Sequence, residues 1–393
     1  NNPHPVSQIL IVENNVPGRL AKLVLYDTLN NEHVLYEPNA KIINISSRIL
    51  NLKIEKTTFA VSKISAHLST INYPGWAQID AIGICEEIVD DKKISEITGD
   101  EELIFEERIM FAGRKEKMTG SINSSYAEAK PLLSPDGKTL YFVRQNAPEN
   151  TGGVDDDQDI YYSDFINNRW TLAQNIGEPL NDLYPNGICS ISADGNTIWV
   201  INGYNSDDSV EDGISVSTKT GNGWSKPKKL DIIGFNNVNQ YQDYFVSNSS
   251  DVILMAIESE DSYGDQDLYV SFKLDLDIWS LPLNLGKTIN TPDVEYAPFL
   301  AADNRTLYFS SNGHDDPAQS DVYYCRRLDD SWLKWSRPKP VGPEINTGGW
   351  DGYFTLSTNS DFAYFVSTEG FTTSVSVKDI NNDIYRIPIN KEP

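Results

Sequence analysis

The sequence predicts an all-β protein in two parts, a short strand-rich segment followed by a long repetitive one. The stretch YAEAKPLLSPDGKTLYF, from Tyr126, has four further copies, which begin at Tyr184, Tyr241, Val294 and Trp350. They follow one another at intervals of about 55 residues, a spacing typical of repeat architectures. Residues 1–88 alternate apolar and polar side chains in short runs, and the charged segment 89–102 separates the two parts.

Composition and charge exclude several classes of function. The chain has 393 residues, of which 39% are hydrophobic, and a net charge of -25. Nucleic-acid binding depends on clustered Lys and Arg, so we expect no nucleic-acid partner. No apolar run approaches the roughly 20 residues that cross a bilayer, so no membrane span is expected. Cys85, Cys189 and Cys325 are far apart, which predicts free thiols rather than disulfides or a zinc site.

Residues 1–88 predict a small β-sandwich. Runs such as AKLVLYDT and VSKISAHLS alternate as half-buried antiparallel strands do, with Asn, Gly and Pro in the gaps. The runs ENNVPGRLAKLVLYD, from Glu13, and YPGWAQIDAIGI, from Tyr73, resemble the second half of a galactose-binding-like (discoidin-type) jelly roll. The resemblance implies a partial jelly roll without its first strands. Residues 89–102 are the expected linker, and residues 103–393 form the second domain.

Each copy of the repeat predicts four short strands. An inner strand opens with an acidic or amide residue, and a turn such as SPDG leads to an apolar second strand, since Asp and Gly suit tight turns. A third strand follows an acidic loop, and the last piece places a tryptophan before a hydrophobic-Asn pair, as in Trp170 and Leu180-Asn181. Four strands repeated radially are typical of a β-propeller blade. The combination of SPDGKTLYF with a following DIY resembles the WD40-like repeats of the TolB type.

The phase of the repeat predicts how the ring closes. The fifth copy ends at NDIYRIPI, three strands into the unit, and the missing fourth piece precedes the first copy, where Ile122-Asn123 repeats the exit pair. An unpaired strand edge is prone to aggregate. We therefore predict a five-bladed β-propeller closed by an N-terminal strand, in which residues 104–112 pair with residues 383–389. Six blades, with strands taken from before residue 103, are the alternative.

Acidic residues at the start of the inner strands are candidates for a cation site, because inner strands line the channel of a propeller. Oxygen ligands of the kind that Ca²⁺ prefers are supplied by Glu128, Asp243, Glu295 and Asp351. The alternative is that they cap backbone N–H groups, in which case we expect no cofactor. A second set recurs in phase ahead of the third strands and predicts one structural hydrogen bond per blade: Asp159, Asp267, Asp321 and Asp383.

Three tryptophans are candidates for a binding surface. Trp332 and Trp350 fall out of phase with the repeat, beside loops, and Trp76 follows a Pro-Gly turn in the first domain. Each is expected either to anchor a partner or glycan or to pack in the core. No GxSxG, HExxH, P-loop or GxGxxG motif is present, and no single blade shows an evident carboxylate pair. The sequence alone therefore predicts that the chain is not an enzyme.

The order of the two domains resembles that of OmpA-family envelope proteins of Bacteroidota, some of which belong to type IX secretion and gliding machinery. The resemblance implies a periplasmic or outer-membrane-associated location and a role as a non-enzymatic protein-interaction scaffold. It implies other envelope proteins as partners, and contact with glycan or peptidoglycan through regions outside this chain. The alternative is a carbohydrate-binding or polysaccharide-processing protein.

Overall fold

The computed structural model divides into two compact units, Asn1–Arg108 and Ile109–Pro393. It describes residues 3–14, 20–36, 47–68, 78–88, 110–111, 113–221, 223–275, 277–314, 319–368 and 382–390. The predicted linker 89–102 lies outside the described residues, as does Trp76. Within the described ranges, no helix is long and apolar enough to cross a membrane.

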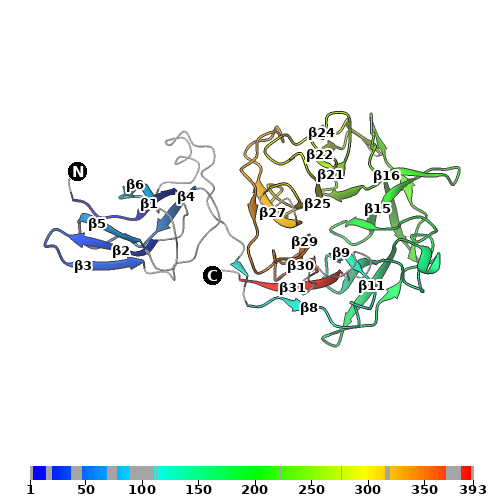
Figure 1. Cartoon of the computed structure of the whole chain (residues 1–393), viewed down its shortest axis with the longest axis horizontal. Helices are drawn as coiled ribbons and strands as arrows, with labels where there is room; N and C mark the ends of the chain where they lie inside the picture. The colour runs from blue at the N-terminus through cyan, green and yellow to red at the C-terminus, as the bar shows by residue number, and fades with distance from the viewer. Residues whose placement is uncertain are drawn as a thin grey trace. The chain divides into compact units, whose positions relative to one another are not determined.

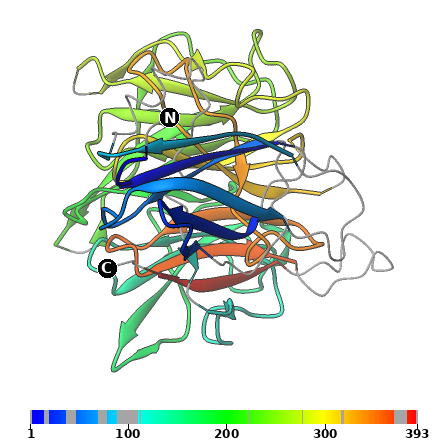
Figure 2. The same cartoon turned by 90° about the vertical axis from the view of Figure 1, so that its left-hand side faces the viewer.

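The described residues of the first unit form two three-stranded antiparallel sheets, coloured in shades of blue in Figures 1 and 2. Their strand orders are β4-β1-β6, from β1 (Gln8–Asn14), β4 (Ser47–Lys53) and β6 (Gln78–Cys85), and β3-β2-β5, from β2 (Leu20–Asp27), β3 (Glu32–Tyr36) and β5 (Val61–Leu68). Side-chain alternation sends Ile9 and Ile11 of β1, and Leu23 and Leu25 of β2, into one shared core. The predicted sandwich is confirmed, and its discoidin-type character stays a prediction.

The described residues of the second unit form five antiparallel sheets, one for each copy of the repeat. The first two contain β9 (Glu128–Leu133), β10 (Thr139–Arg144), β11 (Asp159–Ile166), β12 (Arg169–Trp170) and β13 (Gln174–Asn175), then β14 (Ile188–Ile191), β15 (Thr197–Tyr204), β16 (Val210–Thr220), β17 (Gly223–Trp224) and β18 (Lys228–Lys229). A single 3-10 turn, η1 (Gly153–Asp155), precedes β11.

The remaining three sheets follow the same order of inner, second and third strand. They contain β20 (Asp243–Val246), β21 (Val252–Ile257), β22 (Asp267–Phe272) and β24 (Leu283–Asn284); β25 (Glu295–Leu300), β26 (Thr306–Ser311), β27 (Asp321–Arg326) and β28 (Lys339–Pro340); and β29 (Asp351–Leu356), β30 (Phe362–Ser367), β31 (Asp383–Asn390), β7 (Met110–Phe111) and β8 (Glu116–Lys117). The five sheets correspond to the five repeats, and the count of five blades, rather than six, stays our prediction.

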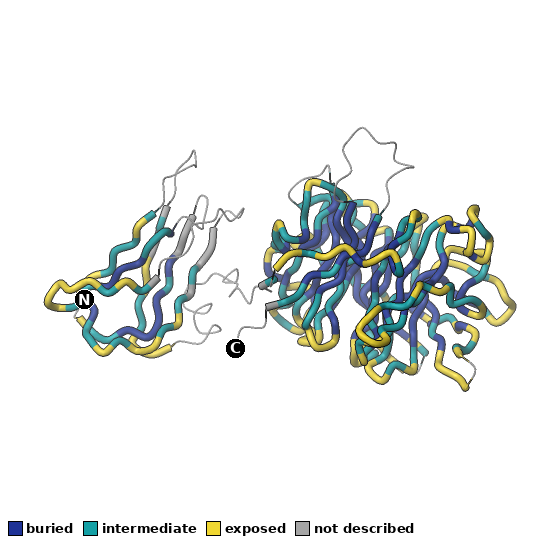
Figure 3. Tube along the Cα trace, turned by 90° about the horizontal axis from the view of Figure 1, so that it is seen from below, coloured by how far each residue is buried: buried dark blue, intermediate teal, exposed yellow. Residues whose placement is uncertain are grey.

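The inner strands contact one another in a closed ring, in the order β9, β14, β20, β25, β29 and back to β9. In Figure 1, β9, β25 and β29 lie nearer the middle of the unit than β11, β16, β22, β27 and β31. Each sheet packs its apolar face on the next, so the buried residues lie between sheets (Figure 3). Phe142 of the first sheet and Val366 of the last share one such core. This arrangement is a β-propeller.

The last sheet is completed by residues that precede the first repeat, as predicted. Phe111 pairs with Ile389 and Met110 with Asn390, so β7 continues the sheet beyond β31. A second short strand, β8, also pairs with β31, through Lys117 and Tyr385. The predicted closing segment 104–112 is confirmed at residues 110–111, residues 104–109 lie outside the described ranges, and the contribution of β8 was not predicted.

The predicted hairpin turns form from their own side chains. Ser134 Oγ accepts the backbone N–H of Thr139 at 2.9 Å and donates to Asp136 Oδ1 at 2.7 Å. Gly137 takes a φ of 72°, which glycine adopts without strain. The second repeat builds the same turn from Ser192 and Asp194.

The second and third sheets are joined by an additional pair of strands. The strand β19 (Asp231–Ile232) runs parallel to β23 (Ile278–Trp279). The backbone N–H of Asp231 donates to the carbonyl of Asp277 at 3.0 Å, and that of Ile233 to the carbonyl of Trp279 at 3.1 Å. Main-chain hydrogen bonds therefore join these two sheets where the exit of the second repeat is longer than the others.

Candidate functional site

The acidic or amide residue that opens each inner strand mostly caps the loop before it. In four repeats its side chain accepts the backbone N–H four residues earlier, through the pairs Ser124 with Glu128 (3.1 Å), Asp182 with Asn186 (2.8 Å), Thr291 with Glu295 (2.7 Å) and Thr347 with Asp351 (2.6 Å). Three of the four predicted cation ligands are therefore used by their own loops. The described residues contain no group of three or more His, Cys, Asp or Glu side chains able to hold a metal ion.

The same loops fix the backbone of the residue that begins each copy of the repeat. The side chains of Ser124, Asp182 and Asn239 accept the backbone N–H of Tyr126, Tyr184 and Tyr241 at 3.0, 2.9 and 3.0 Å. Tyr184 is 49% exposed and Tyr241 is 64% exposed. Three successive repeats thus present a tyrosine at the same point, where the chain enters the inner strand.

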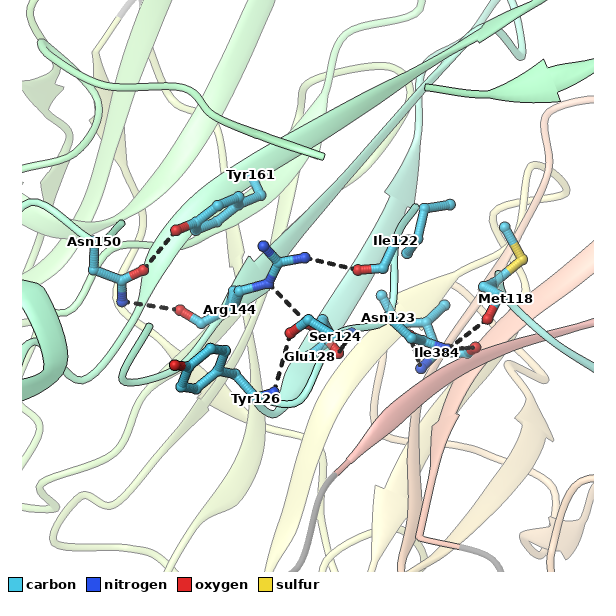
Figure 4. A network of polar contacts seen from close by, with 10 residues as sticks. All are labelled: Met118, Ile122, Asn123, Ser124, Tyr126, Glu128, Arg144, Asn150, Tyr161 and Ile384. Carbon is cyan, nitrogen blue, oxygen red and sulfur yellow. Dashed lines mark hydrogen bonds and ion pairs between the residues drawn. The ribbon is translucent and has the colours of Figure 1, made fainter. Parts of the chain in front are cut away.

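Burial has different consequences for the two buried glutamates of this set. Burial raises the pKa of Glu128, and the Arg144 Nε donor at 2.8 Å opposes the shift (Figure 4). Glu295 is equally buried but is held by Ser311 and Thr291, which are uncharged. Burial therefore raises the pKa of Glu295 to about 7.

Asp243 departs from this pattern, since its carboxylate faces the channel instead of capping a loop. It forms an ion pair with Lys130 of the first inner strand, and it lies close enough to Tyr353 of the fifth to affect the pKa of that hydroxyl. The Lys130 Nζ also lies 5.5 Å from the centre of the Tyr353 ring, a distance typical of a cation–π contact. Burial and the charge of Asp243 together raise the pKa of the Tyr353 hydroxyl. Three different sheets thus contribute to one polar cluster, which we call the channel triad.

The channel triad borders a cavity of about 50 Å³ at the centre of the ring. Its lining comes from all five inner strands and includes Cys189, whose thiol pKa burial raises to about 12. Lys130 and Asp243 keep 14% and 12% of their side-chain surface exposed, so the ion pair is reached by solvent. The arrangement can supply both hydrogen-bond donors and acceptors to a ligand over the channel.

Backbone bulges place two members of the channel triad. Lys130, Ala297 and Tyr353 have φ values of 52°, 49° and 52°, each two residues after the start of its inner strand. The pairing register shifts at the same points. Bulges redirect side chains and are common beside functional sites, and a left-handed φ is uncommon for residues other than glycine. The same local device thus turns Lys130 and Tyr353 to the cavity.

The candidate tryptophans have different surroundings. Trp332 is only 6% exposed and packs edge-on against Trp335 at 5.8 Å, so its ring is not available as the surface anchor that was one of its two expected roles. Trp350 is half-buried, and its ring lies next to the channel triad. The ring centre is 6.1 Å from that of Tyr296 and 5.8 Å from that of Tyr353. Trp76 lies outside the described residues.

The repeat also carries an internal side-chain network in its third and fourth strands. In the first sheet, Asn175 Nδ2 donates to Asp159 Oδ2 at 2.6 Å, and Asn181 Nδ2 donates to Asn175 Oδ1 at 2.8 Å. Asn181 also holds the backbone N–H and carbonyl of Ile160. The third sheet repeats the network through Asp267, Asn284 and Asn290. Asp159 and Asp267 therefore have the structural task expected of the in-phase aspartates.

The fold and the channel define a β-propeller with a polar cluster inside its ring. No known family model and no curated protein sequence is similar to this chain. TolB from Acinetobacter baumannii is similar in structure at 13% identity and a TM-score of 0.40, covering 68% of this chain and 56% of that one. An α-L-arabinofuranosidase from Lactobacillus brevis has 13% identity and a TM-score of 0.46, covering 69% and 92%. A periplasmic gluconolactonase from Pseudomonas aeruginosa has 16% identity and a TM-score of 0.35, covering 61% and 64%.

The match spans little more than half of TolB, and at these identities the likeness concerns the fold. The predicted propeller is confirmed by the closed ring of inner strands, and a WD40-repeat structure is among the similar structures. The TolB type of its repeats stays a prediction. Two expectations are corrected. Several similar structures are glycoside hydrolases. This finding contradicts the predictions of a non-enzymatic envelope scaffold and of a chain that is not an enzyme.

Sequence reasoning missed Lys130, Tyr353 and the in-phase tyrosines. A signal for Lys130 was present, because the corresponding residue of the other four repeats is Ile188, Phe245, Ala297 or Tyr353, and Lys130 alone carries a charge. Comparing the copies for their shared features revealed the scaffold. Comparing them for their differences would have singled out Lys130.

Proposed function

We propose that this chain is a carbohydrate-binding β-propeller protein that holds a saccharide over the mouth of its channel. The observation that carries the proposal is the channel triad of Lys130, Asp243 and Tyr353. The triad departs from the repeat, because Lys130 is the one charged residue at its repeat position and Asp243 does not cap a loop as Glu128, Glu295 and Asp351 do. We also infer a periplasmic or cell-envelope location, which the resemblance to TolB-type repeats implies. Separation of cell fractions, followed by immunodetection, tests that location.

The polar chemistry of the channel suits hydroxyl groups. A sugar hydroxyl both donates and accepts hydrogen bonds, and Lys130 offers donors beside the acceptor oxygens of Asp243. The cavity of about 50 Å³ has room for a few water molecules, at about 10 to 15 Å³ each on this measure, and is too small for a sugar ring. A sugar ring would therefore lie above the channel and direct one substituent into it.

The aromatic residues near the inner-strand starts suit the faces of sugar rings. Tyr184 and Tyr241 are exposed, and their backbones are fixed by Asp182 and Asn239. A tyrosine brings a large contact area at a small cost in conformational entropy, because it has few rotatable bonds. The net charge of -25 disfavours anionic ligands, which leaves neutral saccharides as the preferred class.

Binding is supported more directly than cleavage by the geometry of the channel. Two-carboxylate glycosidases hold their carboxyl groups about 5 to 10 Å apart. Among the described residues that line the cavity, Asp243 is the one carboxylate, and its ion-pair partner is Lys130. The test of the proposal therefore measures binding and cleavage together.

The experiment is titration calorimetry of the whole chain with neutral xylan, arabinan and glucan fragments, with reducing-end release measured on the same samples. We expect saturable binding that Tyr241→Ala weakens about tenfold, while Tyr241→Phe retains it because the ring remains. Leu172→Ala, at an exposed residue away from the inner-strand loops, is the control. Absence of binding to all three polymers, or unchanged affinity in Tyr241→Ala, would overturn the proposal.

A further inference from the structure

The second sheet lacks the side-chain network that the first and third sheets carry. Lys229 pairs with Ser215, as Asn175 pairs with Tyr161 in the first sheet, so Lys229 occupies the position of the first network asparagine. The network aspartate Asp159 precedes Tyr161 by two residues, and the residue two before Ser215 is Gly213. The second asparagine, Asn181, follows Asn175 by six residues, and the residue six after Lys229 is Phe235. All three members of the network are therefore replaced in one repeat.

A cavity of about 320 Å³ lies where that network would be. Gly213, Lys229 and Phe235 all contribute to its lining, together with Glu211, Asp212 and Asn237. Gly213 has no side chain to fill the space, and its φ of 143° favours glycine. This volume lies within the range of about 300 to 1,000 Å³ found for small-molecule sites. The volume of the channel cavity, about 50 Å³, lies below that range.

The lining of this cavity mixes donors and acceptors. Lys229 forms an ion pair with Glu211, and Asp212 accepts hydrogen bonds from Asn237 at 3.2 Å and Gln242 at 3.3 Å. The carboxylates disfavour an anion and the Lys229 ammonium disfavours a cation, whereas a neutral polyhydroxylated ligand can use both kinds of group. Phe235, which is only partly buried, adds an apolar face.

Gln242 connects this cavity with the channel. Its Oε1 accepts the backbone N–H of Gly213 at 2.8 Å and the hydroxyl of Tyr244 at 2.6 Å. Gly213 lines the larger cavity and Tyr244 lines the channel cavity. The exposed Tyr241 immediately precedes Gln242. A chain of sugar units lying on Tyr241 is thus adjacent to both cavities.

We propose that the cavity of the second repeat is a saccharide subsite, which makes an oligosaccharide of several neutral units, rather than a single sugar, the ligand of this propeller. The inference rests on the proposed function, since the subsite extends the site at the channel mouth. The subsite is formed by residues that differ from the repeat pattern. A binding role for this cavity accounts for the glycine at position 213, where the first and third repeats have Asp159 and Asp267.

The test compares monosaccharides with linear tetrasaccharides of glucose, xylose and arabinose, by calorimetry on the full chain. We expect Lys229→Met to raise the Kd of the best tetrasaccharide about tenfold, as loss of a hydrogen bond to a charged group does, and to leave the monosaccharide affinity unchanged. Lys228→Met is the matched control, because Lys228 is the adjacent residue on β18, is exposed and pairs with Asp277. Asn236→Trp, at an exposed residue of the cavity, should block the tetrasaccharide by filling the space.

The outcomes separate the two proposals. If Tyr241→Ala weakens the tetrasaccharide while Lys229→Met and Asn236→Trp bind it as the unchanged chain does, the subsite is overturned and the carbohydrate-binding function stands. If the unchanged chain binds no saccharide of either length, both are overturned. If Lys229→Met does not fold, as judged by thermal unfolding, Asn236→Trp alone decides.

Discussion

Asn123 hydrogen-bonds both backbone groups of Ile384, and the two residues are 261 positions apart in the chain. The Asn123 side-chain oxygen accepts the N–H of Ile384 at 2.9 Å, and its amide donates to the Ile384 carbonyl at 3.0 Å (Figure 4). The Asn123 side-chain amide nitrogen also donates to the carbonyl of Met118 at 3.0 Å, so this nitrogen makes two hydrogen bonds. In the first, third and fourth sheets the equivalent asparagine bonds a strand of its own repeat, whereas Asn123 joins residues before the first repeat to the last strand of the propeller.

Replacing Asn123 should therefore weaken the closed ring. Asn123→Ala removes three buried hydrogen bonds and leaves two backbone groups of Ile384 without a side-chain partner, so we expect the free energy of unfolding to fall by about 2 to 4 kcal/mol. Urea unfolding followed by tryptophan fluorescence measures it, because Trp76 alone among the eight tryptophans precedes residue 109. Asn196→Ala, at an exposed turn, is the control, and equal stability of the two variants would contradict the expectation.

Glu295 should make the propeller less stable as pH rises. Its folded pKa of about 7 lies above the ordinary value of 4.5 for a glutamate, so the folded state binds the proton more tightly than the unfolded state. The stabilisation is fully present below about pH 4.5 and is lost as pH rises through about 7, with a total change of about 3 kcal/mol. Glu295→Gln, which stays neutral, should show a flatter profile between pH 5 and 8. Unfolding curves for both proteins in this range test it, and parallel profiles would argue against a raised pKa.

The ion pair of Lys130 and Asp243 should show strong coupling. Lys130→Met leaves a carboxylate without its partner in a mostly buried site, and we expect a loss of about 2 kcal/mol of stability. The double variant Lys130→Met with Asp243→Asn should lose less than the sum of the single changes, because neither charge is then left alone. Lys226→Met, whose partner Asp208 is exposed, should change stability by less than about 0.5 kcal/mol. Additive effects in the first pair would refute the coupling.

Trp332 should contribute to stability rather than to binding. Its ring packs against Trp335 and Phe272 and stacks with Arg327, whose guanidinium carbon lies 4.5 Å from the ring centre. Trp332→Ala should therefore lower the free energy of unfolding by about 3 kcal/mol or more. Leu333→Ala, at the neighbouring exposed residue, should have little effect. A saccharide affinity that falls in a fully folded Trp332→Ala protein would restore this residue as an anchor.

The sequence was informative about the propeller because each blade repeats the same physical requirements. The SPDG turn, the apolar second strand and the Leu180-Asn181 exit recur since every blade must turn, pack on its neighbours and bind its third strand. The closing strand followed from the phase of those features. The short strand β8 was not predicted, because Glu116 and Lys117 are polar and give no apolar pattern.

The candidate site was less predictable because it depends on contacts between blades. Asp243 has the same place in its repeat as Glu128 and Glu295, and the sequence does not show that its carboxylate meets Lys130 across the channel. Bulges at Lys130 and Tyr353 bring these side chains to the cavity, and no residue type marks such a bulge when its left-handed position is not glycine. Burial likewise distinguishes Trp332 from Trp350 only once neighbouring strands are in place.

The parallel pair of β19 and β23 has a consequence for how this protein can change. The main-chain hydrogen bonds from Asp231 to Asp277 and from Ile233 to Trp279 involve no side-chain atom, so substitutions that keep the backbone in place leave them intact. The apolar core between the same two sheets, which includes Trp199 and Tyr244, is the part of this border that substitutions would weaken. Exposed positions of the border, such as Lys228, are therefore the ones where residues can be exchanged, and new ligand specificities selected, without opening the ring.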